Sequence, residues 1–144
     1  MFSKACEYGI RAIIYIATQS MEGKRVKIGD IAKNSDTPVA FTAKILGLLT
    51  KNNIVLSQTG PNGGFYIELN QMNDIKLGDI VTAIDGDTIY KGCALGLKEC
   101  DNETPCPMHD KFIKVREDLR RVLDTTTVHD LAMGLKSGRS VLMR

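Results

Sequence analysis

The stretch IVLSQTGPNGGFYIEL, residues 54–69, interrupts a sequence whose hydrophobic spacing is otherwise helical. Its two ends, 54–58 and 65–69, are short runs of residues that favour β-strands. The residues between them, 59–64, include one proline and three glycines, which suit a tight turn. The stretch therefore predicts a two-stranded β-hairpin in a mainly α protein.

Three helices are expected before the hairpin. Residues 3–20 place apolar side chains, Cys6 among them, at the spacing of one helical face, and 28–34 form a shorter amphipathic segment. A third helix is expected over 38–52, where Thr37 would be the N-cap and the following proline the first helical residue. This order of helices, turn and hairpin is typical of a winged helix-turn-helix domain, which we assign to residues 1–70.

The third helix of such a domain lies in the major groove of DNA. The side chains expected to face the core are Phe41, Ile45, Leu48 and Leu49, and those expected to face outward are Ala40, Ala43, Lys44, Gly47 and Lys51. Small outward residues would let the helix approach DNA closely, and the lysines would meet phosphates. Near the helix start, Thr42 and Lys44 are expected to reach base edges.

The hairpin tip is expected to touch the DNA backbone or the minor groove. The candidate DNA-contacting residues are Pro38, Val39, Ala40, Thr42, Ala43, Lys44, Lys51, Gln58, Thr59 and Asn62. Residues 1–66 hold eight Lys or Arg against four Asp or Glu, whereas 67–144 hold eleven against thirteen. This asymmetry is compatible with nucleic-acid binding but small, and the same helices would also fit a protein-interaction unit.

Residues 71–144 are expected to be helical around one polar loop. A helix over 76–86 ends at a glycine, and a last helix covers 126–136. Between them, a long helix from Pro107 to about Leu123 carries apolar residues at steps of four and three, as in helices that pair side by side. These residues are Met108, Phe112, Val115, Leu119 and Val122. We assign this half of the chain to a cysteine loop and dimerisation helices.

Three of the four cysteines, Cys93, Cys100 and Cys106, fall in the polar loop, and His109 follows them. Structural zinc sites usually place paired cysteines two to four residues apart, and these gaps are wider. Wider gaps favour an iron–sulfur cluster, 2Fe–2S or 4Fe–4S, with His109 as the local candidate for a fourth ligand. Cys106 and Pro107 would begin the long helix and turn its positive end toward the thiolates.

Other readings of these residues remain open. The three thiols could instead form a disulfide switch or a zinc site, and His109 could be an exposed helix residue. Cys6 lies on the inward stripe of the first helix, so we expect it in the core. No apolar run is long enough for a membrane helix and no signal peptide is recognisable, so a cytoplasmic protein is expected.

The chain resembles the Rrf2 (Rrf-two, BadM) family of bacterial winged-helix regulators, in its IscR/NsrR iron–sulfur branch. The resemblance covers nearly the whole chain. It is carried by EYGIRAIIYIA (7–17), TPVAFTAKILGLLTKNNIV (37–55), GPNGGFYI (60–67), KLGDIVTAIDG (76–86), the three-cysteine loop and the long helix. The glycine-rich wing with its aromatic residue, placed before a three-cysteine loop, is its most specific part.

The resemblance implies a homodimer, paired through the long helix, that binds a palindromic operator and carries one cluster per subunit. The fourth ligand is then His109, as in IscR-like members, or Glu7 from the other subunit, as in NsrR-like members. IscR-like members carry an acidic residue at the position of Ala43 and a wing arginine at that of Thr59. Because both are replaced here, no operator sequence is transferred.

The function expected from these features is a transcriptional regulator, not an enzyme. Its operator binding would follow a cluster that senses iron–sulfur status, nitric oxide or redox state. The alternative is a cluster-free regulator of the same fold that uses its cysteines as a thiol switch or zinc site. An electron carrier is disfavoured because it has no use for a DNA-reading domain. No catalytic constellation or phosphate-binding loop is present.

Overall fold

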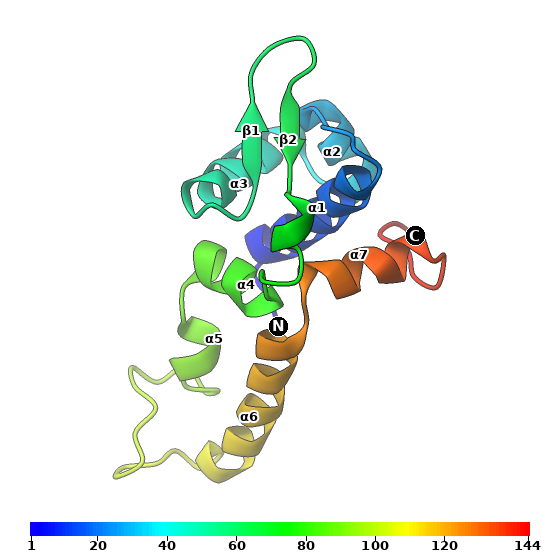
Figure 1. Cartoon of the computed structure of the whole chain (residues 1–144). Helices are drawn as coiled ribbons and strands as arrows, with labels where there is room; N and C mark the ends of the chain where they lie inside the picture. Colours follow the sequence, from blue (N-terminus) through cyan, green and yellow to red (C-terminus); the bar gives the residue numbers. More distant parts are fainter.

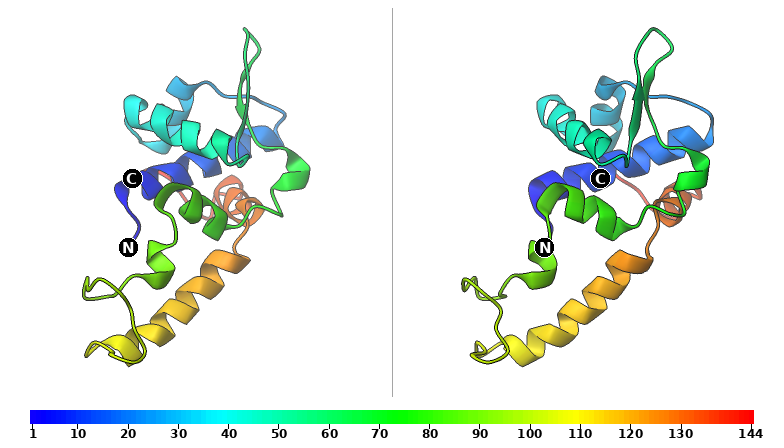
Figure 2. Two further views of the ribbon diagram at one scale, coloured as in Figure 1. Left: turned by 90° about the vertical axis from the view of Figure 1, so that its left-hand side faces the viewer. Right: turned by 60° about the vertical axis from the view of Figure 1, so that its left-hand side comes forward.

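The computed structural model describes residues 1–144 and is mainly α-helical with one small hairpin, as predicted (Figure 1). Its elements are α1 (Lys4–Met21), α2 (Ile28–Ser35), α3 (Val39–Lys51), β1 (Leu56–Gln58), β2 (Gly64–Tyr66), the 3-10 turn η1 (Leu69–Gln71), α4 (Leu77–Asp85), α5 (Thr88–Lys91), α6 (His109–Thr125) and α7 (Val128–Lys136). The hairpin projects at one end of the molecule, and the cysteine loop and the start of α6 lie at the other (Figures 1 and 2). No helix has the length and apolar character that a membrane span requires.

Helix α1 is the centre of the core and packs against α2, α3, α4 and α7. Ser3 caps its start by accepting a hydrogen bond from the Cys6 N–H at 3.0 Å. Cys6, Ile13 and Ile16 are fully buried, which confirms the predicted inward stripe. Burial, aided by the nearby Asp85 carboxylate, raises the pKa of the Cys6 thiol to about 12. Cys6 is therefore a core residue and a poor nucleophile.

Helix α3 is rotated relative to the prediction. Phe41 is 44% exposed and Leu48 is half-buried, whereas Thr42 and Leu46 join the buried face with Ile45 and Leu49. Thr42 can be buried because its hydroxyl donates to the Pro38 carbonyl at 2.7 Å and meets the Thr37 hydroxyl at 2.7 Å.

The start of α3 also differs by one residue from the prediction. Pro38, not Thr37, occupies the N-cap position, and its side chain makes no capping hydrogen bond. Thr37 is buried beneath the turn instead, where its hydroxyl lies 3.2 Å from that of Ser35. The turn between α2 and α3 is thus held by hydroxyl groups.

The backbone geometry of the wing explains why two of its residues, Gly60 and Gly64, are glycines. In the antiparallel hairpin, Gln58 pairs with Gly64, and Gly60 and Gly64 both have positive φ, at 107° and 143°. The adjacent Phe65 forms backbone hydrogen bonds with Val26 at 2.8 and 3.1 Å. A Cβ on Gly64 would lie 2.7 Å from the Val26 carbonyl oxygen. Gly64 therefore lets the hairpin dock against the segment before α2.

Gly64→Ala is expected to lower the free energy of unfolding by about 1–3 kcal/mol, because it adds both a strained φ and a backbone clash. Chemical denaturation followed by circular dichroism measures the change. The matched control is Gly29→Ala in α2, where a new Cβ meets nothing within 4 Å. This control should be neutral or slightly stabilising, since alanine favours helix. Equal stability of the Gly64→Ala and wild-type proteins would contradict the assignment.

The C-terminal half is built on α4 and α6, which pack together. Gly86, with φ of 72°, ends α4 as predicted. Helix α6 begins at His109, two residues later than expected, because Pro107 lies in a turn closed by the His109 N–H and the Cys106 carbonyl at 3.0 Å. Cys106 is therefore not the N-cap of α6; that position belongs to Met108.

Candidate functional site

The cysteine loop folds back from α5 to the start of α6 and groups its ligand candidates in two pairs. The Sγ atoms of Cys93 and Cys106 lie 3.9 Å apart. The Sγ atom of Cys100 lies 3.3 Å from Nδ1 of His109. In the single chain, no three Cys, His, Asp or Glu side chains form one metal-binding group. The loop thus brings the candidates near one another without closing a four-ligand cage.

His109 is buried, with 7% of its surface exposed, so the alternative of an exposed helix residue is wrong. Its Nε2 lies 2.7 Å from Oδ1 of Asn102. Because an amide oxygen only accepts hydrogen bonds, Nε2 is the donor of this pair, and in the neutral imidazole Nδ1 then keeps a lone pair toward Cys100. An imidazole bound through Nδ1 to a metal needs this tautomer, and a hydrogen bond to the other ring nitrogen usually fixes it.

Arg116 of α6 links the loop to the long helix. Its Nη1 lies 3.5 Å from the Cys100 sulfur, and its Nη2 donates to the Gly92 carbonyl. Arg116 therefore ties both Cys100 and the end of α5 to α6. At Cys93, backbone N–H groups of Leu95 and Leu97 lower the pKa of the thiol. The donor set, three thiols and an imidazole with a free Nδ1 lone pair, therefore fits a cluster in its chemistry.

Glu7, the other candidate for a fourth ligand, lies in the first turn of α1. Its carboxylate forms an ion pair with Lys4 at 3.1 Å. Within one chain it does not join the cysteines, because the loop lies at the far end of α6 (Figure 1).

The outward face of α3 carries the small and basic residues that were expected there. Ala40, Ala43, Lys44, Gly47 and Lys51 are all exposed. Pro38 and Val39 are exposed at the helix start, and so are Gln58, Thr59 and Asn62 on the hairpin. The two lysines form no salt bridge and are free to meet phosphates. Thr42 is the exception, because it is 1% exposed and its hydroxyl is already hydrogen-bonded. The expected base contact by Thr42 is therefore wrong.

Sequence reasoning missed four residues that shape these sites. In the cysteine loop, Asn102 contacts His109, and Arg116 contacts Cys100. At the wing, Nζ of Lys27 donates to the Gly60 carbonyl at 3.0 Å, and the Arg25 guanidinium stacks 4.5 Å from the centre of the Tyr66 ring. The basic run KRVK at 24–27 was the available signal for the wing pair. No local pattern pointed to the loop pair.

The chain matches the profile of the Rrf2 family, described as an iron-dependent transcriptional regulator, over residues 2–134. It is 26% identical over 124 residues to the HTH-type transcriptional regulator IscR of Pectobacterium atrosepticum, a match covering 86% of this chain and 74% of that protein. That relative is a transcriptional regulator, which is the class of function expected here.

Two solved structures share the fold and confirm its winged-helix class. CymR, the global cysteine regulator of B. subtilis, superposes with a TM-score of 0.74 at 24% identity, over 92% of this chain and 96% of that one. IscR of T. potens superposes with a TM-score of 0.73 at 20% identity, over 98% of this chain and 92% of that one. The family profile, the fold and the exposed outward face of α3, the helix expected to read DNA, agree. The chain therefore belongs to the Rrf2 family of DNA-binding transcriptional regulators.

Proposed function

We propose that this regulator works as a homodimer whose affinity for a palindromic operator is set by an iron–sulfur cluster on Cys93, Cys100, Cys106 and His109. The observation that carries the proposal is the buried His109, whose Nδ1 faces the Cys100 sulfur at 3.3 Å. A histidine held in the ligand tautomer beside a thiol is what a mixed cysteine–histidine site requires.

The proposed dimer rests on α6. Three apolar side chains of its heptad seam are exposed in the single chain: Phe112 at 37%, Val115 at 58% and Val122 at 53%. Exposed apolar residues at heptad spacing favour pairing with a second helix of the same kind. A twofold pair would present two reading helices to the two halves of a palindromic operator.

The residues around the cluster would connect it to the dimer helix. When bound, the cluster supplies an iron–sulfide centre whose charge and bonding change on oxidation or nitrosylation. Asn102 holds the proton on Nε2 of His109, which keeps Nδ1 available. Arg116 holds Cys100 and the Gly92 carbonyl from the middle of α6, so a shift of the loop would act on the part of that helix next to Val115. The spacing of the two reading helices would then follow the state of the loop.

The test is anaerobic purification followed by a visible absorption spectrum and by iron and sulfide counts. We expect a coloured protein that contains both. His109→Ala should lose its cluster in air about tenfold faster than wild type, because one ligand is gone. Glu7→Ala, which removes only an exposed partner of Lys4, should match wild type.

Two results would oppose this ligand assignment or the proposal itself. If Glu7→Ala lost the cluster and His109→Ala kept it, the fourth ligand would be the partner subunit's carboxylate. If wild-type protein loaded with cluster and protein stripped of it bound every operator equally, cluster control would be excluded.

A thiol switch is the second candidate function, and the 3.9 Å separation of the Cys93 and Cys106 sulfurs favours it. A disulfide needs the sulfurs at about 2.05 Å, which is a short movement for a loop. The two thiols would give two electrons and two protons to a disulfide oxidant such as oxidised glutathione, which becomes two glutathione thiols. An iron-free protein with a Cys93–Cys106 link in its peptide map would support this function. A colourless, zinc-loaded protein would support a zinc site instead.

A further inference from the structure

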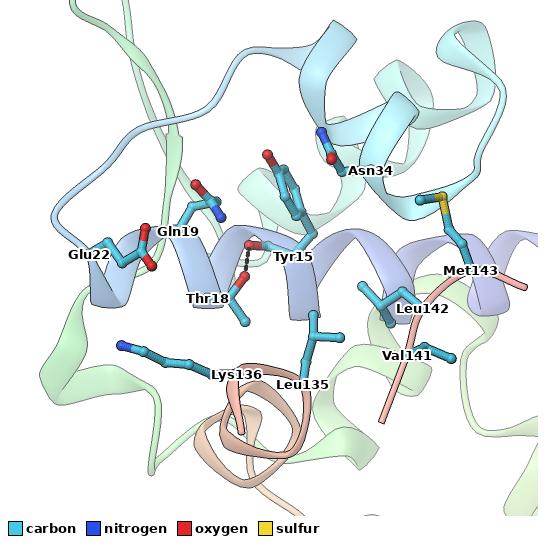
Figure 3. Close-up of a pocket in the computed structure, with 10 residues that line it drawn as sticks. All are labelled: Tyr15, Thr18, Gln19, Glu22, Asn34, Leu135, Lys136, Val141, Leu142 and Met143. Carbon is cyan, nitrogen blue, oxygen red and sulfur yellow. Dashed lines mark hydrogen bonds between the residues drawn. The ribbon is translucent and has the colours of Figure 1, made fainter. Parts of the chain in front are cut away.

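A second candidate site lies on the opposite side of the molecule from the cysteine loop. It is a pocket of about 500 Å³ between α1, the end of α2, the end of α7 and the C-terminal tail (Figure 3). Pockets of this size usually take small molecules. No residue of the DNA-reading face or of the cysteine loop lines this pocket.

The lining is divided into a polar end and an apolar end. Figure 3 shows Gln19, Glu22 and Lys136 gathered at one end. The apolar side chains Val141, Leu142 and Met143 lie at the other end, and Leu135 lies in the middle. Tyr15 and Asn34 lie along the wall between the ends. This division suits an amphipathic ligand with one polar group.

The free hydrogen-bonding groups of the lining define that polar group. The Glu22 carboxylate pairs with Lys24, a residue outside the lining, whose Nζ lies 3.2 Å away. The Lys136 ammonium has no acidic partner, and the Gln19 amide and the Tyr15 hydroxyl have no hydrogen-bond partner in the chain. Burial raises the pKa of Tyr15, so its hydroxyl remains a proton donor. The polar end therefore carries the unpaired Lys136 ammonium, with the neutral donors Gln19 and Tyr15 and the Lys24-paired Glu22 carboxylate beside it.

We propose that this pocket binds a small carboxylate with an apolar body, the carboxylate toward Lys136 and Gln19 and the body against Leu135 and Leu142. The lining comes from α1 and α2 on one side and from α7 and the tail on the other. A bound carboxylate would therefore hold the tail against α1 and α2, which both pack against α3, the helix that carries the DNA-reading surface.

Three probes with the same body and different heads test the proposal: octanoate, 1-octanol and octylamine. Titration calorimetry on the full-length protein should show one octanoate per chain, bound about tenfold tighter than octanol, with octylamine weakest. Lys136→Gln should remove the preference for octanoate over octanol. Leu142→Ser should weaken octanoate and octanol alike. The matched control, Lys114→Gln on α6, makes the same charge change outside the pocket and should bind like wild type.

Circular dichroism and NMR complete the design. Unchanged spectra would show that each variant is folded, and methyl shifts of Leu135, Val141 and Leu142 on adding octanoate would place the ligand. Equal binding of the three probes, no binding by any of them, or an unchanged preference in folded Lys136→Gln would each overturn the proposal.

Discussion

Val115→Glu is expected to convert the proposed dimer into a monomer and to weaken binding to a palindromic operator by about a hundredfold. Val115 is 58% exposed in the single chain and lies in the middle of the apolar seam of α6. In a parallel or antiparallel pair, each glutamate would place a charge in an apolar contact, which is costly. Loss of pairing removes the second half-site contact, which otherwise adds to the first.

Sedimentation gives the oligomeric state, and titration of an operator selected from random DNA by the wild-type protein gives the affinity. A single half-site should bind the variant and the wild type equally, because the reading helix is untouched. Lys114→Glu is the matched control, since it adds negative charge one residue away on another face of α6. A Val115→Glu protein that stays dimeric and keeps its operator affinity would exclude α6 as the dimer contact.

Ile13→Ala is expected to lower the free energy of unfolding by about 3 kcal/mol. Ile13 is fully buried in α1, the helix that packs against α2, α3, α4 and α7. Removing its branched side chain loses apolar burial and leaves a cavity that neighbours from several helices cannot fill together. For a small domain this is a large share of the total stability.

Urea denaturation at two protein concentrations measures the change and separates it from any contribution of dimerisation. Ile13→Val, which removes one methyl group, is the graded control and should cost about 1 kcal/mol. If Ile13→Ala and Ile13→Val were equally stable, α1 would not be the centre of the core.

Hydrophobic spacing located the long helices to within about two residues at their starts, because one apolar face per helix is a local property. It did not determine which face of α3 is inward. That helix carries apolar residues around much of its circumference, so several rotations bury a similar area. Contacts from other segments decide the matter: Phe41 packs edge-on against Tyr8 at 5.7 Å, and Thr42 is satisfied by the Thr37 hydroxyl.

The cysteine loop was recognisable from residue types and gaps, but its internal arrangement was not. Pairing of Cys93 with Cys106, and of Cys100 with His109, depends on how the loop returns to α6. Arg116 reaches Cys100 across sixteen positions of sequence, and nothing in the local pattern marks that contact. Long-range geometry of this kind follows from tertiary packing, which spacing rules do not describe.

Because α6 extends from the rest of the fold, dimerisation should affect how fast the protein is degraded. This helix extends from the rest of the fold and packs mainly against α4 (Figure 2). A chain without a partner leaves the outer turns of α6 and the adjoining loop weakly held, and such segments are where proteases cut first. We expect unpaired chains to be degraded faster than pairs, as limited proteolysis over a dilution series would record. The half-life of the regulator would then lengthen as its own abundance increases.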